Sequence, residues 1–125
     1  MKKIEIAFIE KFITAVSNNN QTVERYFYKG GEKYKKGLYK EALADYTKAI
    51  QLNPQYAAAY SNRGNAKDAL GDKKGAIADY TKAIQLNPQY AMAYYNRGLA
   101  KYKLVDTEGA IEYYTKAIQI NPQYT

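Results

Sequence analysis

The side chains that could do chemistry in this chain are carboxylates, lysines and tyrosines, because the sequence contains no histidine and no cysteine. Histidine and cysteine supply most imidazole bases, thiolate nucleophiles and zinc ligands. Catalysis by carboxylates or lysines survives this filter. However, Asp68, Asp72 and Asp106 fall at expected helix ends or turns, where carboxylates cap helices. We therefore expect no catalytic site, no metal site and no cofactor, and a protein that is not an enzyme.

The excess of basic residues raises a second chemistry, the binding of phosphates. The chain has 19 Lys and Arg against 12 Asp and Glu, a net charge of +7, and its densest lysine cluster lies in residues 29–40 among several tyrosines. Lysines contact phosphates and tyrosines stack on bases. No nucleic-acid-binding motif accompanies the cluster, and exposed lysines also maintain solubility. A basic nucleic-acid-binding adaptor is therefore kept as the alternative function and is not favoured.

The elements that position these side chains come from an internal repeat. The motif NPQY recurs at residues 53–56, 87–90 and 121–124, which is a period of 34 residues. The three units therefore span residues 23–56, 57–90 and 91–124. Residues 44–57 are identical to residues 78–91, so the units are copies of one structure rather than a chance match.

Each unit has the pattern of two helices separated by a turn. In the second unit, one helical pattern ends before Gly71-Asp72 and the next ends at Asn87-Pro88, where proline cannot continue a helix. Glycine and alanine recur at matching positions and leave room for a facing helix to approach closely. Tyrosines recur beside them and fill the remaining space. The sequence therefore predicts three helix-turn-helix hairpins.

A 34-residue helical hairpin with these conserved columns of glycine, alanine, tyrosine and proline resembles the tetratricopeptide repeat (TPR), over 102 of the 125 residues. The resemblance implies an all-α fold, a right-handed α-solenoid whose concave wall is formed mainly by the first helix of each hairpin. It further implies a non-catalytic scaffold for protein–protein interaction that binds a peptide or a helix in the concave groove. The partner is expected to be a protein or peptide of unspecified identity.

The resemblance also indicates which residues face the concave groove. The predicted peptide-binding residues are Phe27, Tyr34, Asn62, Asn65, Met92, Tyr95, Asn96, Leu99 and Tyr102. The aromatic and aliphatic members offer contact area at a low entropy cost, and the asparagines offer paired donors and acceptors to a peptide backbone. Alternatively, the asparagines brace neighbouring helices.

Some TPR proteins clamp the carboxylates of chaperone tails with lysine and arginine on this wall. The matching positions here are Phe27, Gly31, Met92 and Asn96, and Asn62 alone fits that motif. The resemblance therefore does not extend to chaperone-tail binding.

Charged residues replace leucine at one position of the usual TPR pattern, where the second and third repeats have Arg63 and Arg97. Such charges are costly if they are buried alone. Aspartate occurs at a matching position of the second helix in the first two repeats only, as Asp45 and Asp79. We hypothesise that Asp45 pairs with Arg63 and Asp79 with Arg97 across successive repeat interfaces.

The segment before the repeats has the pattern of an amphipathic helix over residues 1–17, followed by a polar linker over residues 18–22. Three positions for this helix remain open: on the exposed face of the first repeat, in a concave groove of its own or another chain, or on a membrane surface or partner. Charges interrupt the apolar stretch, so a membrane span is not favoured and we expect a cytoplasmic protein. Self-association through this helix or through uncapped repeat ends would give a homo-oligomer.

Overall fold

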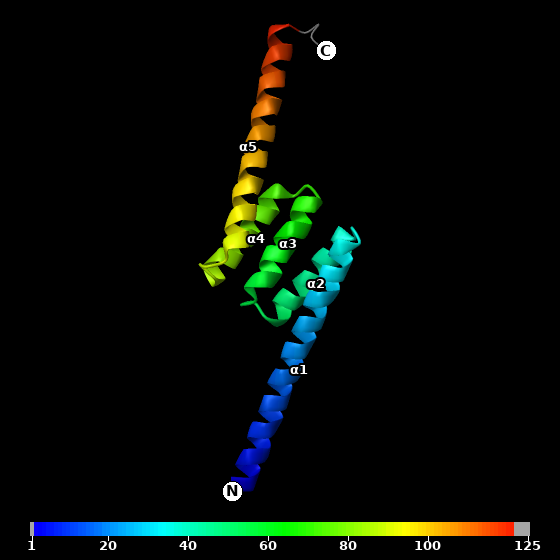
Figure 1. Cartoon of the computed structure of the whole chain (residues 1–125), viewed down its shortest axis with the longest axis vertical. Helices are drawn as coiled ribbons and strands as arrows, with labels where there is room; N and C mark the ends of the chain where they lie inside the picture. The colour runs from blue at the N-terminus through cyan, green and yellow to red at the C-terminus, as the bar shows by residue number, and fades with distance from the viewer. Residues whose placement is uncertain (1, 122–125) are drawn as a thin grey trace.

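The computed structural model describes residues 2–121, and each element in that range is an α-helix (Figure 1). The helices are α1 (Lys2–Lys35), α2 (Tyr39–Leu52), α3 (Ala57–Ala69), α4 (Lys73–Leu86) and α5 (Ala91–Ile120). Two antiparallel hairpins, α1 with α2 and α3 with α4, stack so that α2 contacts α3 and α4 contacts α5. The predicted all-α solenoid of helical hairpins is confirmed.

The two closed hairpins turn at glycines whose backbone is left-handed. Gly37 has a φ of 78° and Gly71 a φ of 88°, a region that glycine enters without the steric cost that a Cβ imposes. At the second turn the amide of Gly71 donates to the carbonyl of Asp68 (3.0 Å), and the amide of Asp72 donates to the carbonyl of Lys67 (2.8 Å). These bonds satisfy the carbonyls at the end of α3, so the chain can reverse at this point.

The core of the hairpins is built from tyrosines packed against glycine and alanine. Tyr46 and Tyr80 are each 2% exposed. A Cβ placed on Gly30 or Gly64 would lie 2.7 Å from the ring of Tyr46 or Tyr80, respectively. The glycines therefore allow the tyrosine rings to lie directly on the facing helix backbone, and the predicted columns of small and aromatic residues meet in both hairpins.

The third unit differs from its predicted form, because its two halves make one continuous helix, α5, instead of a hairpin (Figure 1). Residues 122–124 of the unit lie outside the described residues. The position held by Gly37 and Gly71 is occupied in this unit by Val105. A β-branched residue is strongly disfavoured at positive φ, so the turn of the first two units is disfavoured here and the helix continues.

The predicted linker also differs, because residues 18–22 are helical and belong to α1. This segment is polar but contains no glycine or proline that would end a helix. The hydroxyls of Thr14 and Thr22 donate to the carbonyls of Glu10 and Asn18, so they are satisfied within the helix. The amphipathic segment therefore runs straight out from the hairpins and neither covers the first repeat nor folds into the groove of its own chain.

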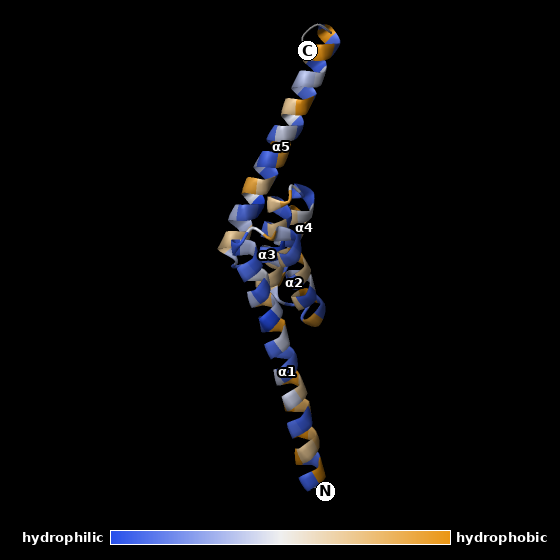
Figure 2. Cartoon of the chain, turned by 90° about the vertical axis from the view of Figure 1, so that its right-hand side faces the viewer, coloured by the Kyte–Doolittle hydropathy of each residue, from blue (hydrophilic) through white to orange (hydrophobic). Residues whose placement is uncertain are grey.

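Apolar residues are exposed along both projecting arms, the first half of α1 and the second half of α5 (Figure 2). Those of α1 are Ile4, Ile6, Phe8, Ile9, Phe12, Ile13 and Val16. Among the described residues, no helix is both long and apolar enough to cross a membrane.

Candidate functional site

The first helix of each unit contributes to one shared wall. A cavity of about 250 Å³ lies where α1, α3 and α5 approach one another. Its lining residues are Tyr34 from α1, Asn65 and Asp68 from α3, Tyr80 from α4, and Asn96 and Leu99 from α5. Four of the predicted wall residues, Tyr34, Asn65, Asn96 and Leu99, are thus brought together.

Asn65 is the centre of a hydrogen-bond network in this cavity. Its side-chain oxygen accepts a bond from the Tyr80 hydroxyl at 2.6 Å and another from the Asn96 amide at 3.2 Å. Burial raises the pKa of the Tyr46 phenol, and Asn62 lies close enough to the Tyr46 hydroxyl to lower that pKa by a smaller amount. Through its two hydrogen bonds Asn65 links α3 to α4 and to α5, as expected for an asparagine that braces neighbouring helices. An asparagine amide has two N–H groups and an accepting oxygen, so one such bond leaves capacity for a ligand backbone.

Burial raises the pKa of the Tyr80 phenol and, to a smaller extent, the pKa values of Tyr34 and Tyr46. The physical cause is the cost of placing a phenolate where water is excluded. These phenols are protonated at neutral pH, and the Tyr80 hydroxyl donates a hydrogen bond to the side-chain oxygen of Asn65. The wall is polar at its centre, where Asn65, Asn96 and Asp68 lie beside the phenols of Tyr34 and Tyr80.

The wall becomes apolar along α5. Met92, Tyr95, Leu99 and Tyr102 recur three or four residues apart on one face of the helix, and their exposed fractions lie between 41% and 71%. Phe27 differs from them, because its ring lies 4.9 Å from that of Tyr56 and 5.9 Å from that of Tyr46 and is half-buried. Phe27 therefore packs within the hairpins, whereas the α5 residues are free to contact a partner.

Comparison with known families and structures decides the identity of this fold. The profile described as TPR repeat matches residues 30–71 and 64–105, and the tetratricopeptide repeat profile matches residues 91–124. The chain belongs to the tetratricopeptide-repeat family. No curated protein sequence matches the chain.

Solved TPR structures are similar over most of this TPR chain. The Arabidopsis OM64 TPR domain is 33% identical, with 86% of this chain and 88% of that chain covered and a TM-score of 0.69. The first TPR of Spaghetti (RPAP3), bound to the HSP90 peptide SRMEEVD, is 31% identical, with coverage of 82% and 81% and a TM-score of 0.67. The TPR2B domain of yeast Sti1, in a complex with pHsp70, is 30% identical, with coverage of 83% and 86% and a TM-score of 0.67.

The charged residues of the TPR hairpins pair differently from the hypothesis. The carboxylate of Asp79 accepts two bonds from Arg63, each 2.8 Å, and lies 3.0 Å from the Lys67 ammonium. These partners belong to the same hairpin, so the predicted Asp79–Arg97 pairing across the interface is wrong. Arg97 instead contacts Thr81, with Nη1 3.4 Å from the hydroxyl oxygen.

The first hairpin follows the same rule. Asp45 pairs with Lys33 across the hairpin, with the ammonium 2.6 Å from the carboxylate, so the predicted Asp45–Arg63 pairing is also wrong. Hydrogen bonding with the partner carboxylate raises the pKa of Arg63 and of Lys33. The Arg63 side chain reaches both helices beside α3, since it binds Asp79 of α4 and its Nη1 lies 3.4 Å from the Thr47 hydroxyl of α2. Spacing in the sequence did not reveal which of these two contacts would be ionic.

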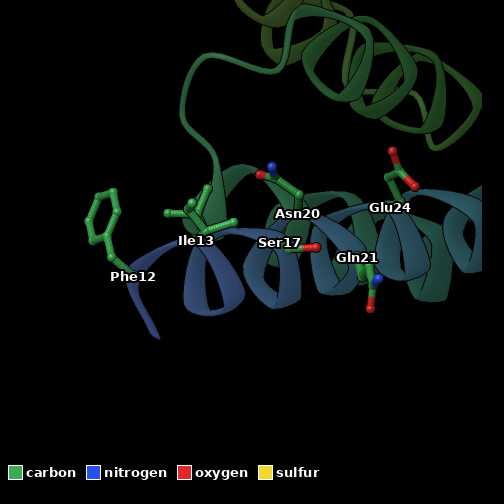
Figure 3. A pocket seen from close by; sticks show the side chains of 7 residues that line it. Phe12, Ile13, Ser17, Asn20, Gln21 and Glu24 are labelled. Atoms are coloured by element: carbon green, nitrogen blue, oxygen red, sulfur yellow. The ribbon is translucent and has the colours of Figure 1, made fainter. Parts of the chain in front are cut away.

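A second surface lies on α1, in the segment where the sequence predicted an amphipathic helix and a linker ahead of the repeats. A depression of about 340 Å³ is lined by Phe12, Ile13, Val16, Ser17, Asn20, Gln21 and Glu24. Figure 3 shows Ile13, Asn20 and Glu24 on the side of α1 that faces the rest of the molecule. The apolar stripe was visible in the sequence, but the expected linker separated it from the repeats. Because α1 is continuous, this surface joins the first repeat directly.

Proposed function

We propose that this protein is a non-catalytic interaction scaffold that binds a peptide or helix of a partner protein along the concave wall formed by α1, α3 and α5. The observation that carries the proposal is the exposed apolar stripe of α5 beside the polar cavity around Asn65. An apolar stripe supplies contact area, and the adjacent amides and phenols can fix the orientation of a bound backbone.

The structural neighbours support a peptide ligand. The TPR of Spaghetti (RPAP3) is bound to a peptide of HSP90, and TPR2B of yeast Sti1 is in a complex with pHsp70. The present wall differs in chemistry from a clamp for acidic tails, because its matching positions are mostly apolar or uncharged. The ligand that it favours is a segment with spaced aromatic or aliphatic side chains.

Titration calorimetry with a selected peptide tests this function. The probe is the strongest binder recovered from a random peptide library displayed on phage and panned against the full chain. We expect Tyr95→Ser and Tyr102→Ser each to weaken its binding at least about tenfold, which corresponds to roughly 1.4 kcal/mol of binding free energy. Both tyrosines are exposed, so neither change should lower the thermal stability of the protein.

Phe8→Ser is the matched control. Phe8 is 72% exposed, like Tyr102 at 71%, but it lies on the projecting arm of α1. The control should bind the peptide as the unmodified chain does. Loss of binding in Phe8→Ser with full binding in both tyrosine variants would move the site to α1 and contradict the proposal.

A further inference from the structure

The open third unit leaves two helix faces without the partner that their counterparts have. Tyr114 corresponds to Tyr46 and Tyr80, yet it is 65% exposed where they are 2% exposed. Gly98 corresponds to Gly30 and Gly64, yet apart from its own stretch of helix backbone no atom lies within 4 Å of the position that its Cβ would take. We name these surfaces the Gly98 face (Tyr94, Gly98 and Lys101) and the Tyr114 face (Ala110, Tyr114 and Ala117).

The two faces have the complementarity of a closed hairpin. Residues 114–119 repeat residues 80–85 without a change, so the second half of α5 presents the same side chains that α4 packs against α3. Their charges are complementary as well. Residues 91–104 contain three basic residues and no acidic ones, whereas residues 105–120 contain three acidic residues and one lysine. A helix with the sequence and acidic charge of the second half of α5 is therefore the natural occupant of the Gly98 face.

The geometry of α5 prevents one chain from satisfying both faces itself while α5 is straight. Sixteen positions separate Gly98 from Tyr114, and at 3.6 residues per turn they lie about 160° apart around a straight helix. The two faces therefore point in nearly opposite directions, and a single neighbouring helix cannot cover both. Contacts between unlike faces of successive copies are heterologous, and such contacts continue from copy to copy unless they close into a ring.

We propose that residues 107–120 of one copy dock antiparallel onto the Gly98 face of a second copy, so that the chain associates head-to-tail through α5. The Tyr114 ring of one copy then lies over Gly98 of the next, as Tyr80 lies over Gly64 within one chain. Val105 is the determinant of this association, because it disfavours the left-handed turn that would close the hairpin internally. The proposal is independent of peptide binding at the concave wall.

Light scattering coupled to size exclusion, over a range of concentrations, tests the proposal with the full chain. The unmodified chain should exceed its monomer mass of 14.2 kDa increasingly as concentration rises, and should pass the mass of a dimer. Val105→Gly restores the glycine of the first two turns, and Asp106 stands where Asp72 caps α4. This variant should close its third hairpin and remain a monomer with unchanged helical circular dichroism.

Two further variants separate the turn from general effects of substitution. Val105→Ala removes the same side chain without permitting a left-handed turn, so it should associate as the unmodified chain does. Gly98→Ala places a methyl group under the docked Tyr114 but meets nothing in the single chain. It should therefore weaken association at least about tenfold and leave the monomer folded.

Chemical cross-linking identifies the contact itself. Lys101 and Tyr113 correspond to Lys67 and Asp79, whose charged atoms lie 3.0 Å apart in the second hairpin. The chain has no cysteine, so the double variant Lys101→Cys/Tyr113→Cys presents a unique pair to a short bis-maleimide. We expect links between chains, and links within one chain when Val105→Gly is added.

The outcomes that would overturn the proposal are specific. They are a monomer at every concentration, a mass that stops at two chains, association that persists in Val105→Gly, or cross-links confined to single chains with Val105 present.

Discussion

At the scale of single residues, the structure depends on charges and glycines whose partners lie on the facing helix. Composition and spacing predicted that the unusual arginines would be paired with aspartates, that the glycines would let a facing helix approach closely, and that tyrosines would fill the space beside them. The tyrosine contacts follow from the repeat itself, because the period places the same residues at the same helix crossing. The ionic partners could not be predicted, because a long side chain such as that of Arg63 reaches two helices and only its direction decides between them.

The Arg63–Asp79 pair gives the first prediction. The two side chains are 18% and 6% exposed, so Asp79→Ala leaves Arg63 and Lys67 partly buried without their carboxylate. We expect a loss of about 3–5 kcal/mol in the free energy of unfolding, measured by urea denaturation. Glu108→Gln is the control, because Glu108 and Lys74 are 3.9 Å apart and mostly exposed, and it should change stability by less than about 1 kcal/mol. An equal loss of stability in Asp79→Ala and Glu108→Gln would contradict the claim that burial makes the Asp79 ion pairs important.

The glycine–tyrosine contact gives the second prediction. Gly64→Ala puts a methyl group 2.7 Å from the Tyr80 ring and 3.2 Å from the carbonyl oxygen of Ala76, so overpacking should cost about 1–3 kcal/mol. Gly31→Ala on the same type of helix meets only the Tyr46 hydroxyl, at 3.8 Å, and should instead stabilise the protein by up to about 1 kcal/mol. Thermal denaturation distinguishes the two. A stabilised Gly64→Ala variant would be inconsistent with the packing described.

Buried tyrosines give a prediction for alkaline pH. Burial raises the pKa of Tyr80 and Tyr46 above their ordinary value of 10.0. The unfolded chain therefore loses these protons first, so stability is complete below about pH 10 and falls as pH rises through the folded-state pKa values. Urea midpoints should therefore drop as the pH rises above about 10, and the drop should be smaller in Tyr80→Phe. An equal drop in Tyr80→Phe would mean that the loss of stability at alkaline pH comes from titrating groups other than Tyr80.

At the scale of elements, turn residues decided where helices end. The sequence predicted the two closed hairpins, because Gly71-Asp72 marks the turn of the second unit, the repeat implies the same turn in the first, and Asn-Pro marks the end of each unit. It did not predict that α5 would be continuous, although the signal was present in Val105 at the glycine position. It also did not predict that α1 would continue through residues 18–22, because polar composition was read as a linker where no residue breaks the helix.

The cap of α4 tests this role of turn residues. The carboxylate of Asp72 accepts a bond from the amide of Gly75 at 2.9 Å, so Asp72→Ala should lower the free energy of unfolding by about 0.5–2 kcal/mol. The matching residue of the third unit, Asp106, lies inside the continuous α5 and caps no helix there. Asp106→Ala should therefore be neutral or slightly stabilising in thermal denaturation. A similar loss in both variants would indicate that the third hairpin is closed.

At the scale of the whole molecule, the chain is two closed TPR hairpins with a long helical arm at each end (Figure 1). The stacking places the first helices of successive units on one wall, which is why the resemblance to the TPR could assign Tyr34, Asn65, Asn96 and Leu99 to one concave surface. The arms could not be predicted in this way, because each unit was assumed to fold alike. The wall and the arms offer separate surfaces, and binding at the wall is the central claim.

Amide chemical-shift mapping of the isotope-labelled full chain, titrated with the peptide selected from the library, tests that claim most directly. Binding at the concave wall predicts shifts concentrated in residues 31–35 of α1, residues 62–69 of α3 and residues 92–103 of α5. Shifts confined to residues 4–16 of α1, or spread over the outer helices α2 and α4, would contradict it.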